Sequence, residues 1–347
     1  MKIFAAHDGG SGCCLGYYRV TLPLQELAKH DGFEVVFADA GDRDGHRSPV
    51  TLRDLTEHGY DLIVGQRLSK HSGMGIWRGA WAPDRKLVYE TDDDVFTVNK
   101  ENWQAYSLFQ RGDIQDAVTH HAEVADLITV TNEHLAQVMT EATGNGNVAI
   151  LPNHVPGWVL GMERPPRPRP SIGWQGGASH GADIGIVADP VRRFLKRFPG
   201  WDLQLCGTDY RPTFKAGDRA SYVDWVRVHD DPRGYYETMN FDIGLAPLAG
   251  TAFDSSKSFL KALEYNALGI PVLASDVEAY RGYVKDGVNG FLIKRDHEWL
   301  KRLSELAGDD ALRVKMSEAS RECAREYVIE RGYRLWADAY ERLFKRE

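Results

Sequence analysis

The chain has few cysteines, no excess of positive charge and no long hydrophobic run among its 347 residues. Its four cysteines show neither the spacing of zinc ligands nor a disulfide framework, so we expect a reducing, cytoplasmic environment. The net charge of −8 disfavours a general nucleic-acid-binding protein, whose bound face is basic. No apolar run approaches the roughly 20 residues that span a bilayer, so we expect no transmembrane segment.

Short hydrophobic strand patterns alternate with helical patterns along most of the chain. Strands are predicted at 2–6, 33–38, 62–64, 86–90, 127–130, 148–151, 171–174, 202–206, 226–228, 242–246 and 271–274. Helices are predicted between them, at 114–124, 133–142, 183–198, 233–239, 259–268 and from 298 to the end. This alternation predicts an α/β protein with parallel sheets covered by helices.

A proline-rich segment interrupts the alternation. Four prolines occur within residues 164–170, which excludes a helix interior or a central strand. We expect an extended linker at 161–170 between two Rossmann-like domains, 1–160 and 171–325; a loop within one domain is the alternative. Residues 326–347 are expected to form an amphipathic C-terminal helix. Because ligands bind beyond the carboxyl ends of parallel strands, two facing sheets would share one central cleft.

The strongest chemical pattern is a polar loop followed by a helix, at 253–268. Ser255 or Ser256 is suited to N-cap the helix, and first-turn amides favour an anion. Lys257 adds a positive charge and Ser258 a further hydroxyl, so the segment suits a diphosphate. Glu264 lies two turns later, where its carboxylate can accept hydrogen bonds from ribose hydroxyls. An ordinary capped helix with Glu264 in solvent or paired to a lysine is the alternative.

A glycine-rich loop follows the first strand of the second domain. Gly176 and Gly177 allow the backbone to approach a ligand closely, and Ser179 and His180 open the next helix, whose N-terminus favours phosphate. This loop is the second candidate for donor binding, and a flexible turn is the alternative.

The first domain has a comparable loop after its first strand. Gly10 and Gly12 belong to a pattern that is similar to a dinucleotide fingerprint, and Asp39 ends the second strand as a ribose-binding acid would. We favour contact with donor phosphates and acceptor over NAD binding. Arg19 follows this loop, where it can reach a phosphate or an acceptor anion, or lie on a helix surface.

Consecutive carboxylates close the predicted strand at 86–90. Asp92 and Asp93 are costly there unless they are solvated, hydrogen-bonded or bound to a metal. We expect one of them to line the acceptor side and to orient or deprotonate the acceptor hydroxyl. A divalent metal site and an exposed acidic loop are the alternatives.

The second half of the chain resembles a known family. The residues that carry the resemblance are Leu263, Glu264, Tyr265, Ala267, Gly269, Pro271, Val272, Ala274 and Ser275, supported by the segments 125–132, 150–153, 242–248 and 286–292. They resemble the donor-site signature of retaining GT-B glycosyltransferases, the group 1 bacterial sugar transferases akin to glycogen and sucrose synthases. The segment from Lys257 to Tyr265 is similar to a subgroup with a Lys-Ser-x-x-Lys-x-Leu-Glu-Tyr motif.

The resemblance implies a GT-B fold whose last helix packs on the first domain, and a UDP- or GDP-sugar as donor substrate. Glu264 matches the second glutamate of the family's pair, whereas Ser256 stands where the first is usual. The Arg and Lys that the family places after the second-domain glycine loop are absent. Lys257 would then stabilise the departing diphosphate, without a required cofactor or metal.

The resemblance further implies retention at the anomeric carbon. The acceptor is open among polysaccharide, glycolipid, protein and modified nucleic acid, and the sequence does not define an oligomer. A sugar-nucleotide epimerase, an NAD-dependent oxidoreductase and a non-catalytic sugar-nucleotide-binding protein are the other functions that fit this pattern.

Overall fold

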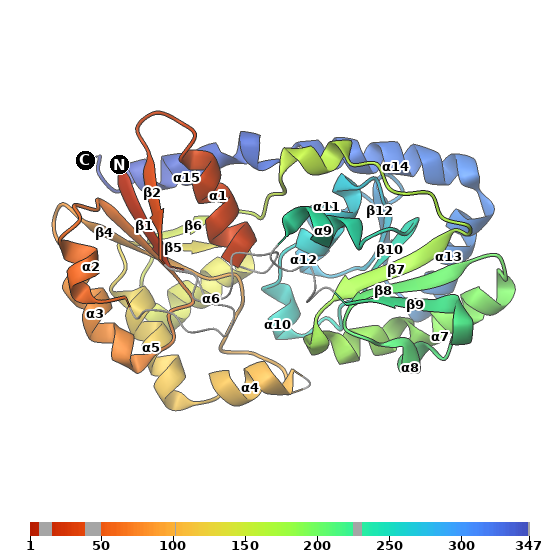
Figure 1. Cartoon of the computed structure of the whole chain (residues 1–347). Coiled ribbons are helices and arrows are strands. Elements are labelled where there is room, and N and C mark those ends of the chain that lie inside the picture. Colours follow the sequence, from red (N-terminus) through yellow and green to blue (C-terminus); the bar gives the residue numbers. More distant parts are fainter. Residues whose placement is uncertain (7–15, 39–49, 101, 225–230, 346–347) are drawn as a thin grey trace. The chain divides into compact units, whose positions relative to one another are not determined.

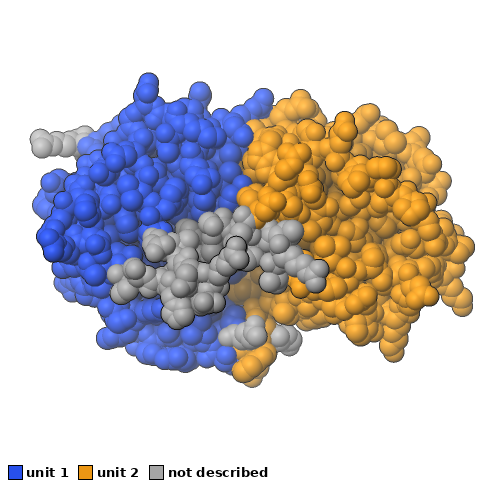
Figure 2. Space-filling model, viewed as in Figure 1, with its two compact units in different colours: residues 1–98, 105–153, 329–347 blue, residues 99–104, 154–328 orange. Residues whose placement is uncertain are grey.

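The computed structural model describes residues 1–6, 16–38, 50–100, 102–224 and 231–345. These residues form two compact units (Figure 2). Unit 1 comprises residues 1–98, 105–153 and 329–347, and unit 2 comprises 99–104 and 154–328. Each unit is an α/β sandwich with a parallel sheet (Figure 1), which confirms the fold class expected from the alternation of strands and helices.

Within its described residues, unit 1 contains a six-stranded sheet in the order β2-β1-β3-β4-β5-β6. Its strands are β1 (Lys2–Ala6), β2 (Glu34–Phe37), β3 (Leu62–Gln66), β4 (Lys86–Glu90), β5 (Leu127–Val130) and β6 (Val148–Ile150). The helical segments are η1 (Tyr17–Thr21), α1 (Leu22–Leu27), α2 (Leu52–Thr56), η2 (His71–Gly73), α3 (Met74–Ala80), α4 (Trp103–Phe109), α5 (Gly112–Glu123), α6 (Glu133–Thr143) and α15 (Ile329–Arg342).

The central strands of the unit 1 sheet are buried on both faces of the sheet. Residues of β3, β4 and β5 are buried along their whole length apart from the first residue of β4. Continuous hydrophobic runs of this kind are typical of parallel strands that are buried on both faces of the sheet. The C-terminal helix α15 lies beside α1 (Figure 1) and buries Trp336 and Tyr340 in unit 1.

The described residues of unit 2 form a second six-stranded parallel sheet, in the order β12-β11-β10-β7-β8-β9. Its strands are β7 (Ser171–Gly176), β8 (Asp202–Gly207), β9 (Ala220–Val223), β10 (Ile243–Ala246), β11 (Val272–Ser275) and β12 (Gly290–Ile293). Its helical segments are η3 (Gly157–Gly161), η4 (Ala178–His180), α7 (Gly181–Arg197), α8 (Arg211–Phe214), η5 (Gly217–Arg219), α9 (Pro232–Glu237), α10 (Ala252–Ser255), α11 (Leu260–Ala267), α12 (Glu278–Arg281), α13 (Asp296–Gly308) and α14 (Asp310–Arg325).

Glycines let aromatic rings pack directly on the central strands of unit 2. A Cβ on Gly173 of β7 would lie 2.0 Å from the Phe241 ring, and one on Gly244 of β10 would lie 2.3 Å from the Tyr265 ring of α11. No side chain fits in either place. The close approach of α11 to β10 that these glycines permit positions the polar residues of α11 at the carboxyl edge of the sheet.

Two sequence expectations differ from the structure in unit 2. The sixth strand of the sheet is β9 at 220–223, whereas the expected strand at 226–228 lies outside the described residues. The helix expected from 298 to the end is divided, because α13 ends at Gly308, α14 spans Asp310–Arg325 and α15 begins at Ile329. The backbone between α14 and α15 hydrogen-bonds elsewhere: the carbonyl of Tyr327 accepts from the amide of Val155 at 2.9 Å.

The proline-rich segment belongs to unit 2. Apart from the short piece 99–104, the chain passes from unit 1 to unit 2 between residues 153 and 154 and returns between 328 and 329. The guanidinium of Arg164 donates to the carbonyl of Phe241, and Arg167 pairs with Asp242. The segment is therefore a loop held on unit 2, the alternative to a linker that the sequence left open. No helix in the described part of the chain is long and apolar enough to cross a bilayer.

Candidate functional site

In unit 2 the strands from β7 to β9 are added on one side of β7, and those from β10 to β12 on its other side. This reversal places a topological switch point between β7 and β10. Ligands of open α/β sheets bind outside the carboxyl ends of the strands at this point. A cavity of about 110 Å³ opens there, lined by Ser179 and His180 after β7 and by Thr251, Asp254 and Lys257 after β10. The cavity is smaller than the roughly 300–1,000 Å³ that encloses a drug-sized ligand, so it suits one part of a ligand.

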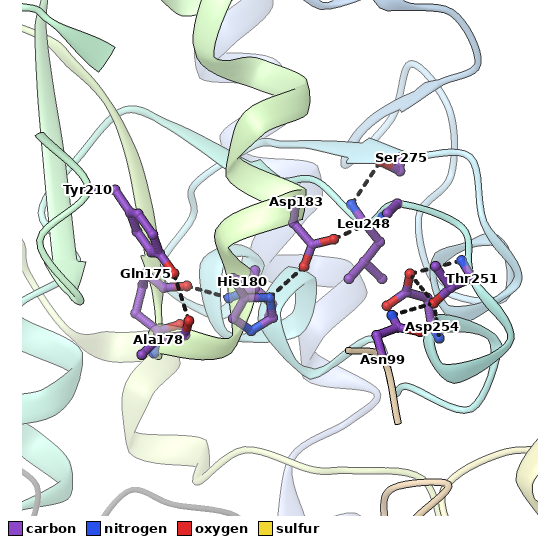
Figure 3. A network of polar contacts seen from close by, with 12 residues as sticks. Asn99, Gln175, Ala178, His180, Asp183, Tyr210, Leu248, Thr251, Asp254 and Ser275 are labelled. Atoms are coloured by element: carbon purple, nitrogen blue, oxygen red, sulfur yellow. Dashed lines mark hydrogen bonds and ion pairs between the residues drawn. The ribbon is translucent and has the colours of Figure 1, made fainter. Parts of the chain in front are cut away.

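His180 and Asp183 form a hydrogen-bonded pair in this cavity (Figure 3). The Nδ1 atom of His180 lies 2.7 Å from Oδ2 of Asp183, and Oδ1 of Asp183 accepts from the backbone amide of Ala249 at 2.9 Å. Burial lowers the pKa of His180, with a further contribution from the charge of Lys261. A neutral ring that donates from Nδ1 to Asp183 has an acceptor at Nε2.

The helix cap after β10 is not the one expected from the sequence. The expected cap of α11 by Ser255 or Ser256 does not form, because the N-cap position of α11 is Phe259 and no side chain caps this helix. Thr251 instead caps the short preceding helix α10 in a reciprocal box with Asp254, and Asn99 donates to the Thr251 hydroxyl at 2.9 Å (Figure 3). The Thr-x-x-Asp spacing satisfies two amides of the first turn of α10, those of Thr251 and Asp254. Ser255 ends α10, and Ser256 follows as a fully buried residue.

Lys257 and Ser258 lie between α10 and α11. The Nζ atom of Lys257 lies 4.3 Å from the centre of the Phe253 ring, and the residue lines the cavity. The Ser258 hydroxyl accepts from the amide of Leu260 at 3.4 Å. The cation therefore stands beside the cavity next to the loop that follows β10.

A second cation, Lys261 of α11, lies at the carboxyl end of β7. Its ammonium donates to the carbonyl of Gln175 and lies 5.1 Å from the centre of the Trp174 ring. Burial lowers the pKa of Lys261 to about 8, against the opposing charge of Glu264. A Cβ on Gly176 would lie 3.1 Å from this ammonium and 2.5 Å from Trp174, so only glycine fits there. Gly177 follows in an extended conformation.

Glu264 lies inside a hydrogen-bond network. Its side chain is 3% exposed, and its Oε1 accepts from the Tyr235 hydroxyl at 2.9 Å. The Gln175 amide donates in turn to Tyr235 at 2.7 Å, and the backbone amide of Gln175 donates to the Tyr265 hydroxyl at 2.9 Å. Gln175 therefore joins β7 to both α9 and α11. The alternative of a solvated Glu264 is wrong, because the side chain is buried beside Tyr235.

Sequence reasoning missed several of these residues. Lys261 stands within the Lys-Ser-x-x-Lys-x-Leu-Glu-Tyr motif, so its place in the motif was a usable signal. Asp183 follows His180 by three residues at the start of α7, a spacing at which side chains meet on a helix. Tyr235 and Gln175 carry no local signal, since their partners are distant in the sequence.

Arg19 of unit 1 is buried rather than exposed to an acceptor. Its guanidinium is fully enclosed and bonds both carboxylate oxygens of Glu90 at 2.7 and 3.0 Å. It also donates to Oδ1 of Asn153 at 3.0 Å and to the carbonyl of Leu151. The hydroxyl of Thr129 donates to Glu90, whose pKa is raised by burial. The expected contact of Arg19 with a phosphate or acceptor anion does not fit this position, because its donors serve Glu90 and the neighbouring strand ends.

The acidic residues after β4 differ from one another. Asp92 is 5% exposed, and burial, followed by the charge of Asp93, raises its pKa to about 7. Asp93 pairs with Arg67 at 3.5 Å. Asp94 is fully buried and accepts from the amide of Phe96 at 2.9 Å and from Thr97. The alternative of an exposed acidic loop is therefore wrong for Asp92 and Asp94.

The remaining predictions concern the first glycine-rich loop and the alternative of a metal site. Gly10 and Gly12 lie outside the described residues. No group of three or more His, Cys, Asp and Glu side chains in the described ranges is arranged to hold a metal ion.

Comparisons with known proteins show a family match in unit 2 and a fold shared with solved structures. Residues 260–323, which include Lys261 and Glu264, match the family described as "Glycosyl transferases group 1". No curated protein sequence matches the chain. The match covers α11 and extends through most of α14.

Solved structures share the fold over nearly the whole chain. Sucrose-phosphate synthase from Thermosynechococcus elongatus is 17% identical with a TM-score of 0.66, and the alignment covers 99% of both chains. Anabaena HepE in complex with UDP and glucose is 16% identical with a TM-score of 0.68, covering 99% of this chain and 100% of that one. A glycosyltransferase from Rickettsia africae ESF-5 is 13% identical with a TM-score of 0.67, covering 100% and 99%. The fold is that of GT-B glycosyltransferases, and together with the family match it supports a glycosyltransferase enzyme.

Proposed function

We propose that the protein transfers a sugar from a nucleoside-diphosphate sugar to an acceptor hydroxyl, with retention at the anomeric carbon and without a metal ion. The observation that carries the proposal is the pair of lysines at the unit 2 switch point. Lys257 lines the cavity, and Lys261 lies at the turn after β7, inside the family match. Two ammonium groups beside a glycine turn suit a diphosphate.

In this proposal the donor is bound by unit 2. The amides around Gly176 and Gly177, with Ser179, Lys257 and Lys261, hold the diphosphate. The solved HepE structure contains UDP and glucose, which makes a uridine nucleotide the first donor to test. Glu264 is held by Tyr235 and accepts hydrogen bonds from the ribose. The resemblance to retaining GT-B glycosyltransferases implies the same role for this glutamate.

The chemical step uses the same cations. As the bond between the anomeric carbon and the diphosphate breaks, negative charge grows on the departing phosphate oxygen. The ammonium groups of Lys257 and Lys261 stabilise that charge more strongly than they stabilise the ground state. The acceptor oxygen forms the new bond to the anomeric carbon, and its proton passes to Asp92, Asp93 or the departing phosphate.

Direct binding measurements test the donor assignment. Calorimetric titration with UDP, GDP, CMP, NAD and their sugar conjugates should show one sugar nucleotide bound by the wild-type protein. Glu264→Gln should weaken that binding about tenfold or more, because hydrogen bonds to a charged group contribute roughly 1.5–3 kcal/mol. Glu318→Gln, an exposed glutamate on α14, is the matched control and should bind as the wild type does.

Two outcomes would contradict the proposal. Binding of NAD alone would make the protein an oxidoreductase candidate. Binding of a sugar nucleotide that Glu264→Gln leaves unchanged would remove Glu264 from the ribose site.

A further inference from the structure

The last two turns of α7 carry a dense group of positive charges. Residues 190–201 contain four cations, Arg192, Arg193, Lys196 and Arg197, and no carboxylate. Arg192 is half-buried, and the other three side chains are exposed. Because the whole chain has a net charge of −8, a local group of this sign does not follow from the composition.

Cations from distant segments extend this group. The Nε atom of Arg169 donates to the carbonyl of Gly200 at 3.2 Å, just beyond the end of α7. The guanidinium of Arg219 donates to the carbonyl of Leu195 in the last turn of the helix.

Helix α8 brings a further lysine to the same place. The Nη1 atom of Arg192 donates to the carbonyl of Thr213 at 3.2 Å, so α8 lies against the last turns of α7 (Figure 1). Lys215 follows α8 and is exposed. We call this set of residues the basic patch: Arg169, Arg193, Lys196, Arg197, Lys215 and Arg219.

Nearby carboxylates neutralise part of the basic patch. Three of them lie in the same segments: Asp189, Asp202 and Asp218. The first lies 4.0 Å from Arg193, and the second lies 3.4 Å from Arg169. Lys196 and Lys215 form no ion pair with any residue that the structure describes. The surface therefore keeps an excess of positive charge.

The basic patch lies at the amino edge of the unit 2 sheet. Helix α7 begins after the carboxyl end of β7 and ends shortly before β8 starts at Asp202, and Arg169 precedes the first residue of β7. The cavity beside Lys257 lies at the opposite, carboxyl edge. A partner bound to the basic patch therefore leaves this cavity open to the solution.

An exposed apolar side chain borders the basic patch. The guanidinium of Arg313 on α14 lies 5.2 Å from the centre of the Trp201 ring, in the turn after α7. The next residue of α14, Val314, is 59% exposed. Protein surfaces that bind the interface of a bilayer combine cations with exposed apolar side chains.

The aromatic rings of this surface are not available to nucleic-acid bases. Phe194 and Trp201 are buried, and Phe198 stacks on Phe194 at 5.0 Å. Proteins that bind single-stranded nucleic acid stack the bases on exposed rings. The α7 cations also form two adjacent rows, since 192 and 196, like 193 and 197, are four residues apart. Such a broad face suits a planar anionic surface.

We propose that the basic patch docks unit 2 on the surface of a bilayer that contains anionic phospholipids. The ammonium and guanidinium groups of Lys196, Arg197 and Lys215 lie at the level of the headgroup phosphates. Each cation near such a surface raises the affinity about fivefold, and salt screens the attraction. This docking leaves the carboxyl edge of unit 2 accessible from the solution. The inference is independent of the proposed function.

Vesicle sedimentation with the full chain tests the proposal. The vesicles contain phosphatidylcholine and phosphatidylglycerol in equal parts, or phosphatidylcholine alone. The wild type should bind the mixed vesicles at about 0.1 M NaCl, and raising the salt to about 0.5 M should release it. The double variant Lys196→Gln with Arg197→Gln should bind the mixed vesicles about thirtyfold more weakly, because two exposed cations are removed.

A matched control removes the same two side-chain types from unit 1. Lys70→Gln with Arg78→Gln changes the net charge equally at two exposed positions. This variant should bind the mixed vesicles as the wild type does. Equal weakening in both double variants would show that net charge alone controls vesicle binding, and that result would overturn the proposal.

Three further outcomes would overturn it. Cations in the last turn of a helix also offset its dipole. If Lys196 and Arg197 have only this role, their double variant should lower the unfolding midpoint and bind vesicles as the wild type does. Equal binding of the wild type to vesicles with and without phosphatidylglycerol would exclude an anionic surface. Tighter binding to a single-stranded oligonucleotide than to the mixed vesicles, lost in the double variant, would make nucleic acid the partner.

Discussion

The carboxyl edges of the two sheets share a topology and differ in how their polar groups are satisfied. At the unit 2 edge, Gln175 distributes hydrogen bonds to Tyr235 and Tyr265, and Lys261 caps its carbonyl. At the unit 1 edge, one enclosed ion pair between Arg19 and Glu90 holds the strand ends. Residues beside that pair keep buried polar atoms without partners.

This difference separates two kinds of preorganisation. The unit 2 edge holds two lysines close to a glycine turn, so positive potential is in place before an anion arrives. At the unit 1 edge, the arginines are paired with carboxylates, and the side chains of Gln66 and Thr131 remain as neutral hydrogen-bonding groups. We therefore expect single changes at the unit 1 ion pair to affect stability most, and single changes at the unit 2 edge to affect donor binding most.

Arg19→Met should have the largest effect on stability. The change leaves Glu90 buried with the hydroxyl of Thr129 as its partner in place of a guanidinium. Breaking a buried ion pair on one side costs about 3–5 kcal/mol, because the remaining charge is uncompensated. Urea unfolding of the variant measures this loss.

Two further variants show whether the loss comes from the ion pair. The double change Arg19→Met with Glu90→Gln should recover part of the loss, because no buried charge remains. Arg53→Met removes an exposed partner of Glu57 on α2 and should cost less than about 1 kcal/mol. Equal losses for Arg19→Met and Arg53→Met would show that the enclosure of the Arg19–Glu90 pair adds nothing to its contribution to stability.

The sequence predicted most strands of both sheets from their hydrophobic runs, but it missed β9 and the short apolar run of β12. The Thr251–Asp254 box has a Thr-x-x-Asp spacing that is readable in the sequence, but it caps the short helix α10, which the sequence analysis did not predict. The burial of Arg19 was not predictable, because its partner Glu90 is 71 residues away and only the packed sheet brings them together. Tyr235 lies 29 residues from Glu264 for the same reason.

Lys261→Met should have the largest effect on donor binding. A charge-assisted hydrogen bond contributes roughly 1.5–3 kcal/mol, so the dissociation constant for the sugar nucleotide should rise about tenfold to a hundredfold. Lys301→Met, an exposed lysine on α13, is the control and should leave the constant unchanged. A small change for Lys261→Met would place the diphosphate away from the turn after β7.

Donor affinity should also depend on pH through Lys261. Burial lowers its pKa to about 8, so the ammonium loses its proton as the pH rises through that value. An anion binds the protonated form, and donor affinity should therefore fall above pH 8. Binding near pH 8 should take up protons, measured as a dependence of the calorimetric enthalpy on the ionisation enthalpy of the buffer. Lys261→Met should abolish this uptake.

Tyr235→Phe should have the smallest effect of the series. It removes one hydroxyl that donates to Glu264 and accepts from Gln175, in a network whose other bonds remain. A single neutral hydrogen bond contributes about 1 kcal/mol, so stability should fall by that amount and the KM for the donor should rise about fivefold. The kcat should change less, because Tyr235 holds Glu264, which in the proposed donor site binds the ribose and not the breaking bond. Tyr222→Phe, which removes a hydroxyl bonded to the carbonyl of Gly207, should lose similar stability with an unchanged KM. A KM change of equal size in both variants would mean that Tyr235 acts through the stability of unit 2 rather than through Glu264.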